Sequence, residues 1–343
     1  MTIQTDASIG LKQETTYGTY IAPDRFLEFL PPDNFDLDRT WYQGMGLRPG
    51  TRVDRSGRRV LARDGGKGDF ELEVPAKGLG TTLNAIFGVG ASTLVSGTLY
   101  QQLFKPIHSD YLPSMTIQKG IPRLGAATVD AYSFLGSECE SADFSIAQDG
   151  VLKLKTNWRS RQVVTSQAYA VPSYPTPIDL FTFVGASLVL GGTVTLPTAT
   201  TLATGGTSVA DIKDFNFTWD NKLDPNKGNL GGAGLRTRQS SVQIADGKGK
   251  LSAEYDTTVF RDAVLSGSTL ALVATFVASG AALIGTSQPT LQITLPDVRL
   301  VGTLPKAPTK GEVVQQQLDF QAYDNLVAAE AIFVGVLTGD TSL

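Results

Sequence analysis

The chain has 343 residues, of which 41% are hydrophobic and 18% are charged, and its formal net charge is −4. This balance is typical of a globular protein with a sizeable core, and it argues against a disordered chain or a general nucleic-acid binder. The single cysteine, Cys139, excludes an internal disulfide framework and a cysteine-based zinc site. Plentiful glycine and β-branched residues favour strands and tight turns over helices.

We expect neither a signal peptide nor a membrane span. The first residues lack the basic segment and the apolar segment that a signal peptide requires. Residues 269–285 are the only stretch that could suggest a span, but it is short and rich in β-branched residues. It predicts a buried strand, a turn at Ser279-Gly280 and a second apolar segment. Residues 1–24 show no apolar periodicity and predict a polar N-terminal arm.

The first half of the chain is predicted to contain short strands and one helix. Alternating apolar and polar residues predict half-buried strands at 34–38 and 69–75. Residues 81–87 predict a short helix, because the apolar residues share one face and Gly88 follows them. Further strands are expected at 26–30, 114–118, 132–138, 143–146 and 151–158, the last two as a hairpin.

A long Gly-rich arm joins the two alternating strands. Between residues 38 and 68 eight cations face three acids, so the arm carries about +5 while the whole chain is negative. Trp41, Tyr42, Met45 and Leu47 lie among these charges. Long loops without a use are uncommon in compact domains, and aromatic residues, Met and Arg are enriched in interface cores. The arm therefore predicts a contact with another copy of the same protein.

Two alternatives remain for this arm. It could be a solvated basic loop, although such a loop does not need interleaved aromatic residues. It could also bind nucleic acid, because arginine with aromatic residues suits phosphate contacts and base stacking; the rest of the chain, at about −9, would oppose DNA. The residues expected to contact another copy are Arg39, Trp41, Tyr42, Arg48, Arg52, Arg55, Arg58, Arg59, Arg63, Arg236 and Arg238.

The second half of the chain repeats the order of the first. Residues 214–219 match 34–39, and a second Gly-rich arm follows at 220–248. The same order of strand, arm, strand, helix and strands is hard to obtain by chance. The remaining counterparts are strands at 250–255, 270–277, 290–295 and 310–320 and a helix at 258–265, before a last buried strand at 331–337.

The predicted fold is mainly β, with two tandem β-sandwich or barrel domains. Each domain has one short flanking α-helix, and long extended arms are added to the domains. The Pro-rich segment 170–177 cannot form a central strand or a helix and marks the boundary. The predicted division is an N-terminal arm at 1–24, a first domain at 25–176 with its arm at 38–68, and a second domain at 177–343 with its arm at 220–248.

No catalytic, cofactor or metal site is predicted. His108 is the only histidine, so a Ser-His-Asp hydrolase would depend on it, and a loop histidine is the simpler interpretation. Residues 220–226 faintly resemble a Ca²⁺ loop, but they lack the EF-hand spacing, and Asx turns explain them. Cys139 lies between two glutamates, which should raise the pKa of its thiol and make it a poor nucleophile. We therefore expect no enzyme and no cofactor.

The N-terminal residues carry a family resemblance. Residues 10–19, GLKQETTYGT, followed by 22–27, APDRFL, resemble the start of tail tube proteins (major tail proteins) of long-tailed, siphovirus-like bacteriophages. The element 46–50, GLRPG, and the strand 215–218 with Asp220-Asn221 after it are similar to the same family. The resemblance extends over nearly the whole chain, and the internal repeat is similar to the tandem-domain type of the family.

The resemblance implies a structural virion protein of the phage tail, made in the host cytoplasm. In this family β-sandwich or barrel domains join their sheets into rings, and the rings stack into a hollow tube for genome delivery. Three chains would supply six domains, so the implied ring is a homotrimer of pseudo-hexameric form, with a homohexamer as the alternative. In such a ring the long basic arm would recur on every other domain.

The implied partners are further copies of the chain and other tail proteins, namely the tape measure, tail tip and terminator proteins. DNA would pass through the lumen without specific binding, and the low isoelectric point permits an acidic lumen that would repel phosphate. The alternative function is a tandem β-sandwich adhesin or carbohydrate-binding module. Such a module would present exposed aromatic residues on one sheet face.

Overall fold

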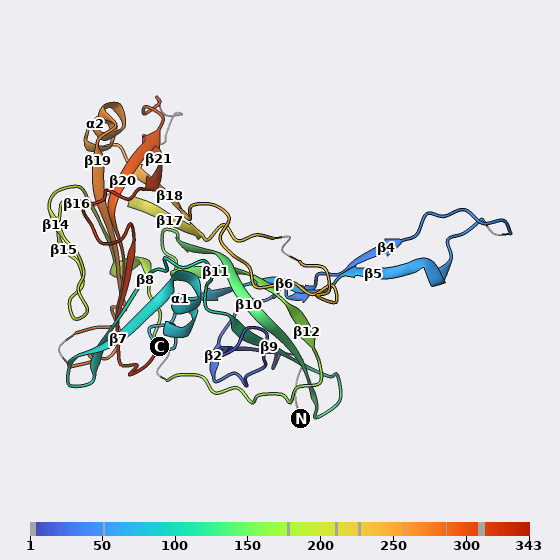
Figure 1. Ribbon diagram of the computed structural model, residues 1–343. Helices are drawn as coiled ribbons and strands as arrows, with labels where there is room; N and C mark the ends of the chain where they lie inside the picture. Colours follow the sequence, from blue (N-terminus) through green and yellow to red (C-terminus); the bar gives the residue numbers. More distant parts are fainter. Residues whose placement is uncertain are drawn as a thin grey trace.

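The computed structural model describes residues 5–50, 52–176, 179–209, 212–225, 228–256, 258–285, 287–307 and 313–343. Strands make up 49% of the chain and helices 7%, so the fold is mainly β, as predicted. Figure 1 shows twisted antiparallel sheets from which one long hairpin projects sideways. Pro177, Asn226 and residues 310–312, which belong to predicted segments, lie outside the described residues.

Six strands of the first half form one antiparallel series in the order β1, β9, β10, β11, β6, β3. The strand β10 belongs to two sheets, because its first half pairs with β9 and its second half pairs with β11. The bounds are Ser8–Gln13 (β1), Met115–Pro122 (β9), Val129–Ile146 (β10), Lys153–Ser160 (β11), Gly66–Glu73 (β6) and Asp36–Leu37 (β3), with Arg25–Leu27 (β2) on β1 and Gln162–Val164 (β12) on β10.

Six strands of the second half repeat this series in the order β13, β19, β20, β21, β18, β17, again antiparallel throughout. The predicted internal repeat is therefore present in the pairing of the strands. The bounds are Ala186–Leu190 (β13), Thr269–Val277 (β19), Thr290–Gly302 (β20), Gln315–Ala322 (β21), Asp246–Glu254 (β18) and Ile212–Asp220 (β17). Minor elements are η2 (Phe183–Gly185), β16 (Ser208–Val209) beside β13, and the pair β14 (Val194–Thr195) and β15 (Thr204–Gly205).

The strand register corrects the alignment of the two halves by two residues. Lys67 and Lys248 are equivalent in the sequences GGKG and DGKG. Lys67 lies opposite Asp36 of β3, and Lys248 lies opposite Thr218 of β17. Asp36 is therefore the counterpart of Thr218, whereas the sequence match placed it with Asn216. A shift of two residues keeps every side chain on the same face of a strand, so the apolar pattern alone could not detect it.

The two halves share one sheet and one core. Residues 141–146 of β10 pair antiparallel with residues 215–220 of β17, so the sheet continues from the first half into the second. Across this junction the ring of Phe144 stacks on that of Phe217 at 6.5 Å, and Phe217 stacks on Phe320 at 6.4 Å. A second connection is made by β22 (Phe333–Thr338), which pairs with β20 and with β8 of the hairpin β7–β8 (Gly88–Ser96 and Leu99–Pro106).

Both predicted helices are present. The helix α1 (Gly80–Phe87) is buried along its whole length, and α2 (Val259–Ser266) lies at the corresponding place of the second half. Each ends at a glycine in the left-handed conformation, Gly88 with φ 91° and Gly267 with φ 61°. The stretch at 269–285 is a strand followed by a turn at Ser279-Gly280, as predicted.

Other parts of the first half differ from the prediction. Ser8–Gln13, inside the predicted polar arm 1–24, is the buried strand β1, because Ile9 and Leu11 enter the core. The hairpin β7–β8 was not predicted. The strands expected at 132–138 and 143–146 are one strand with a bulge between Cys139 and Ser141, and the strand expected at 34–38 has two residues. The boundary at 176–177 stays a prediction.

Candidate functional site

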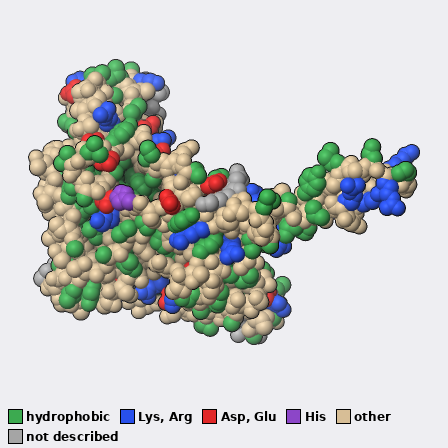
Figure 2. Space-filling model, in the orientation of Figure 1, with side chains coloured by type: hydrophobic (Ala, Val, Ile, Leu, Met, Phe, Trp, Pro, Cys, Tyr) green, Lys and Arg blue, Asp and Glu red, His purple; other side chains and the backbone are tan. Residues whose placement is uncertain are grey.

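The predicted arm is a projecting β-hairpin. Its strands β4 (Thr40–Gln43) and β5 (Arg59–Arg63) pair antiparallel, and the 3₁₀ turn η1 (Ser56–Arg58) lies near the tip. We expected a long extended arm without strands of its own, but pairing two strands satisfies backbone N–H and C=O groups that have no core to enter. Figure 2 shows hydrophobic side chains along the hairpin and a cluster of Lys and Arg side chains at its end.

The hairpin exposes a row of apolar side chains. Leu47 is fully exposed and Met45 nearly so, while Trp41 lies 5.1 Å below the guanidinium of Arg59. Two-stranded hairpins are marginal in water, and a contiguous exposed apolar surface on a soluble protein marks an interaction site. The exposed apolar residues of the arm are Leu37, Trp41, Tyr42, Met45, Leu47, Val53, Val60 and Leu61.

Arginines at the tip bind the hairpin's own backbone and leave their charge available. Arg58 Nη1 donates to the Gly46 carbonyl oxygen at 3.0 Å, and Arg55 Nη2 donates to the Arg48 carbonyl oxygen at 3.1 Å. In the part of the chain that the structure describes, the ion pairs formed by arm arginines join Arg39 to Asp64 and Arg63 to Asp38 at the base. No such pair includes Arg48, Arg52, Arg55, Arg58 or Arg59.

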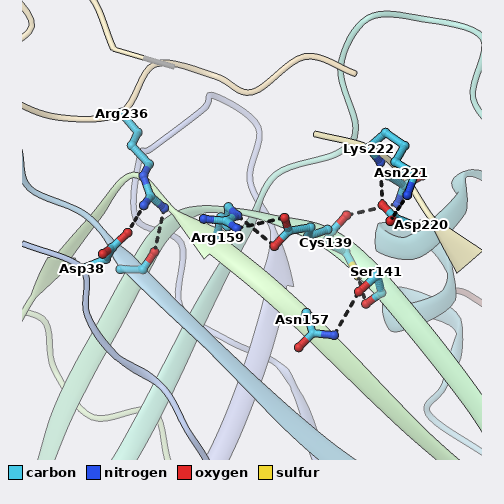
Figure 3. Close-up of polar contacts among 11 residues, drawn as sticks. Asp38, Cys139, Ser141, Asn157, Arg159, Asp220, Asn221, Lys222 and Arg236 are labelled. Atoms are coloured by element: carbon cyan, nitrogen blue, oxygen red, sulfur yellow. Dashed lines mark hydrogen bonds and ion pairs between the residues drawn. The ribbon is translucent and has the colours of Figure 1, made fainter. Parts of the chain in front are cut away.

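The base of the arm is fixed to the body by a buried arginine. Arg236 pairs with Asp38, as Figure 3 shows, and donates to the Gly66 carbonyl oxygen at 3.2 Å. Burial lowers the pKa of the Arg236 guanidinium, and the charge of Asp38 opposes this effect. Only 2% of Arg236 is exposed, so it has little surface to offer another subunit. Its place inside the subunit is a reason to remove it from the expected contact residues.

The second arm folds back onto the body instead of projecting. The Asp64 N–H of the first arm donates to the Gly234 carbonyl oxygen at 2.8 Å. Arg238 donates to the Leu112 carbonyl oxygen at 2.6 Å and lies 3.4 Å from the buried carboxylate of Glu138. The two arms therefore have different surroundings: the first offers a surface, and the second holds the first in place.

A hollow lies at the end of β6 that is remote from the arm. The arm leaves the sheet at Gly66, whereas the hollow is lined by Leu72 and Glu73 at the other end of β6, together with residues 26–30 and others. Its volume is about 430 Å³, and its walls are mostly apolar and aromatic. Two carboxylates, Glu28 and Glu73, and one cation, Lys77, also line it. The basic arm and this partly acidic hollow thus lie at opposite ends of one strand.

One face of the shared sheet is polar along eight consecutive strands, β3, β6, β11, β10, β17, β18, β21 and β20. Alternate residues of β6 and β11 point to this face, where Lys155 lies 3.2 Å from Asp69 and Lys153 lies 3.2 Å from Glu71. The remaining residues of these strands are buried, except for half-buried Gly68. The polar face therefore carries charges of both signs, and some of them are paired across neighbouring strands.

The sequence features considered for chemistry have structural explanations. His108 is an exposed loop residue whose Nε2 lies 2.7 Å from Glu330. Burial, aided by Glu140, raises the pKa of the Cys139 thiol, as predicted. The Lys222 N–H donates to Asp220 Oδ1 at 2.8 Å, which is the predicted Asx turn. Among the described residues, no group of three or more His, Cys, Asp or Glu could hold a metal ion, and no helix is long and apolar enough to cross a membrane.

Comparison with known proteins decides the family. Residues 4–322 match the sequence profile of a family described as phage tail tube protein. The chain belongs to the phage tail tube protein family. A search of curated proteins finds no match. The protein is therefore a structural component of a phage tail, in agreement with the resemblance of its N-terminal residues.

The most specific stretch of that resemblance has a structural role in this tail tube protein that we did not anticipate. Glu14 is buried and accepts hydrogen bonds from Ser114 Oγ (2.9 Å), Thr116 Oγ1 (3.0 Å), Gly136 N–H (2.8 Å) and Gly18 N–H (2.7 Å). These bonds hold the N-terminal segment on β9 and β10. The only signal in the sequence was a glutamate between apolar β1 residues and a Gly-containing turn.

Proposed function

We propose that this tail tube protein assembles with itself into stacked rings that form the conduit for genome delivery. Three copies make a ring, in which six repeats give a pseudo-hexameric tube; a ring of six copies is the alternative. The proposal includes a division into domains at 25–176 and 177–343. It rests most directly on the junction of β10 with β17, where one repeat already joins the next by edge-to-edge strand pairing.

The polar face of the eight-strand sheet lines the lumen in this proposal. Several of its charged side chains are paired across neighbouring strands, as in Lys155–Asp69 and Lys153–Glu71. Cations that are already paired with carboxylates attract phosphate less than isolated ones do. DNA therefore passes along this face without specific binding. This mixed lining replaces the purely acidic lumen that the low isoelectric point permitted.

The projecting hairpin makes the contact between rings. Its apolar row and its tip arginines, which form no ion pair among the described residues, need a partner surface, and the hollow beside Glu28 and Glu73 offers apolar walls with carboxylates. Because arm and hollow lie at opposite ends of β6, copies can stack head to tail along one direction. One arm projects per copy, so the axial contact has threefold character inside a tube that contains six repeats.

Further partners follow from this role. The tube starts and ends on other tail proteins, namely the tail tip, terminator and tape measure proteins of a siphovirus-like phage. The subunit is made in the host cytoplasm and functions in the virion. The alternative of an adhesin or carbohydrate-binding module gains no support from the family match.

Negative-stain electron microscopy of the purified protein tests the proposal. The expected result is rings or tubes of one fixed diameter over a range of protein concentrations, with assembly weakened by high salt. Monodisperse monomers at every concentration and temperature, even with other tail components added, would contradict it.

A further inference from the structure

The junction inside the chain provides a template for a junction between copies. At the internal junction Ala142 and Phe144 of β10 lie opposite Trp219 and Phe217 of β17, and all four side chains are buried. On the polar face, Asp143 lies opposite Thr218, whose hydroxyl donates to Asp143 Oδ1 at 2.8 Å. An apolar side and a hydroxyl–carboxylate pair thus define this contact.

The repeat assigns a counterpart to each strand of the junction. The counterpart of β10 is β20, because each is the third strand of its series. The strand β10 pairs with β11, and β20 pairs with β21. Ala142 lies opposite Thr156, and Gly302 lies opposite Leu318. Trp158 lies opposite Gly68 and Phe320 lies opposite Gly249, so these two aromatic residues are equivalent. Thr156 and Leu318 each lie two residues before them and are therefore equivalent as well. Gly302 is therefore the counterpart of Ala142, and Leu304 that of Phe144.

Within the described residues, no strand pairs with the end of β20 on the edge that corresponds to the β17 side of β10. The strand β19 covers this edge only as far as Arg299. The Thr303 carbonyl oxygen accepts from Gln316 Nε2 on the β21 side at 3.3 Å, so the backbone groups of Gly302 and Leu304 point to the opposite, open side. Leu304 is 53% exposed, whereas its counterpart Phe144 is fully buried at the internal junction.

The other half of the junction is also present, and no strand that the structure describes occupies its junction side. The strand β3, counterpart of β17, pairs with β6 on one side only. The N–H groups of Phe35 and Leu37 point to the other side, because Asn34 and Asp38 donate to β6. Leu37 is 42% exposed, whereas its counterpart Trp219 is 4% exposed. Each chain therefore has one open edge of each kind.

Side chains cap the open edge of β3. The Phe35 N–H donates to Asp33 Oδ1 at 3.2 Å, and the Leu37 N–H donates to Asp36 Oδ1 at 2.7 Å. Lys119 Nζ donates to the Phe35 carbonyl oxygen at 3.2 Å and lies 2.6 Å from Asp33. Charged side chains on an edge strand prevent unwanted strand pairing. These caps must turn away before another strand can pair with β3.

We propose that β3 of a second copy pairs antiparallel with the end of β20, in the register of the internal junction. Gly302 then lies opposite Leu37 of the second copy, and Leu304 lies opposite Phe35 of the second copy. Thr303 lies opposite Asp36 of the second copy, which restores the hydroxyl–carboxylate pair with the two roles exchanged between the strands. The inference rests on the proposed function and names the surface that joins copies within a ring.

This contact leads to a closed assembly. The two surfaces on each copy differ, so the contact is head to tail, and repeated rotation by a fixed angle closes a ring. Because the contact copies the internal junction, the rotation between copies matches that between the repeats inside a copy. Apolar Leu37 and Leu304 become buried, as their internal counterparts are. The caps on β3 keep free subunits apart until two edges meet.

Cysteine cross-linking tests the register. Asp36 and Thr303 would form a non-hydrogen-bonded pair, in which Cα atoms lie about 4.5 Å apart, close enough for a disulfide. Native Cys139 is buried and does not compete. Oxidised assemblies of the D36C/T303C double variant should run as covalent trimers on non-reducing gels. Either single variant should run as monomers.

Two control pairs accompany this variant. D143C/T218C joins the internal counterparts and should form a disulfide within one chain, without covalent oligomers. D36C/V301C is shifted by two residues and should cross-link at least tenfold more slowly. If D36C/T303C assembles and cross-links no faster than the shifted pair, the register is wrong although ring formation stands.

Hydrogen exchange of the unmodified protein covers the case in which the cysteine variant does not assemble. The amides of Gly302, Leu304 and Lys306 should exchange at least tenfold more slowly in tubes than in free subunits. Unchanged exchange at these three amides in tubes overturns the inference. A failure of the unmodified protein to form any ring or tube contradicts the proposed function instead.

Discussion

Glu14 is a single carboxylate on which four hydrogen-bond donors from three parts of the first half converge. Each of its donors is buried or half-buried, so water cannot readily replace the carboxylate. A stretch that resembles the family can therefore contribute to the folding of the subunit instead of to contacts between subunits. In this tail tube protein it fixes the N-terminal segment on β9 and β10.

Replacing Glu14 with Ala should destabilise the subunit by about 3 kcal/mol or more, because buried donors lose their acceptor. Urea unfolding of unassembled subunits measures this change. Glu28→Ala serves as the control, since Glu28 is an exposed acid and its loss should change stability by less than about 0.5 kcal/mol. Equal effects of the two variants would contradict the role assigned to Glu14.

Single residues also show where sequence reasoning stops. The charge of Arg236 placed it with the arginines of the first arm, yet its side chain is buried beside Asp38. Burial of an arginine depends on a partner 198 residues away, and no local pattern reveals that partner. By contrast, the two neighbouring glutamates predicted the direction in which the pKa of the Cys139 thiol is shifted, although burial is its main cause.

At the level of elements, the projecting arm is the feature that the sequence indicated most clearly. Its length, charge and aromatic residues predicted a contact surface at 38–68, although not the hairpin itself. The pairing of β4 with β5 was hidden because Trp41, Tyr42, Val60 and Leu61 are all exposed. Strand patterns are recognised by one buried face, and this hairpin has none in the free subunit.

Replacing Arg52, Arg55, Arg58 and Arg59 with Ser should leave the fold intact and weaken ring stacking roughly tenfold or more. The physical reason is the loss of four exposed cations from the contact, so the effect should resemble that of high salt. Circular dichroism checks the fold, and tube length by electron microscopy checks stacking. A control removes the same number of body cations that pair with acids: Lys12, Arg123, Lys213 and Arg261. Normal tubes from the arm variant would show that the arm is not the axial contact.

The hollow at the far end of β6 makes a separate prediction. Reversing the charge of Glu28 and Glu73 to Lys should shorten tubes, because the basic arm would then meet like charges. Combining this change with R55E/R58E should restore part of the tube length. Analytical ultracentrifugation and electron microscopy measure both. If the reversal leaves stacking unchanged, the arm binds elsewhere on the neighbouring ring.

At the scale of the whole molecule, the internal repeat was predictable and the strand register was not. The order of turns and strands exposed the duplication, because glycine-rich turns are local signals. The register needed the pairing of Lys67 with Asp36 and of Lys248 with Thr218. The junction of β10 with β17 was also invisible in the sequence, since both strands alternate equally well as edge or central strands.

The most direct test is a cryo-electron microscopy reconstruction of tubes formed by the purified protein. With eight sheet strands per copy, three copies should close one continuous sheet of 24 strands around the lumen. We expect β20 of each copy beside β3 of the next, and three arms reaching the neighbouring ring. A ring with another number of copies, or a lumen formed by separate unjoined sheets, would contradict the proposed tail tube.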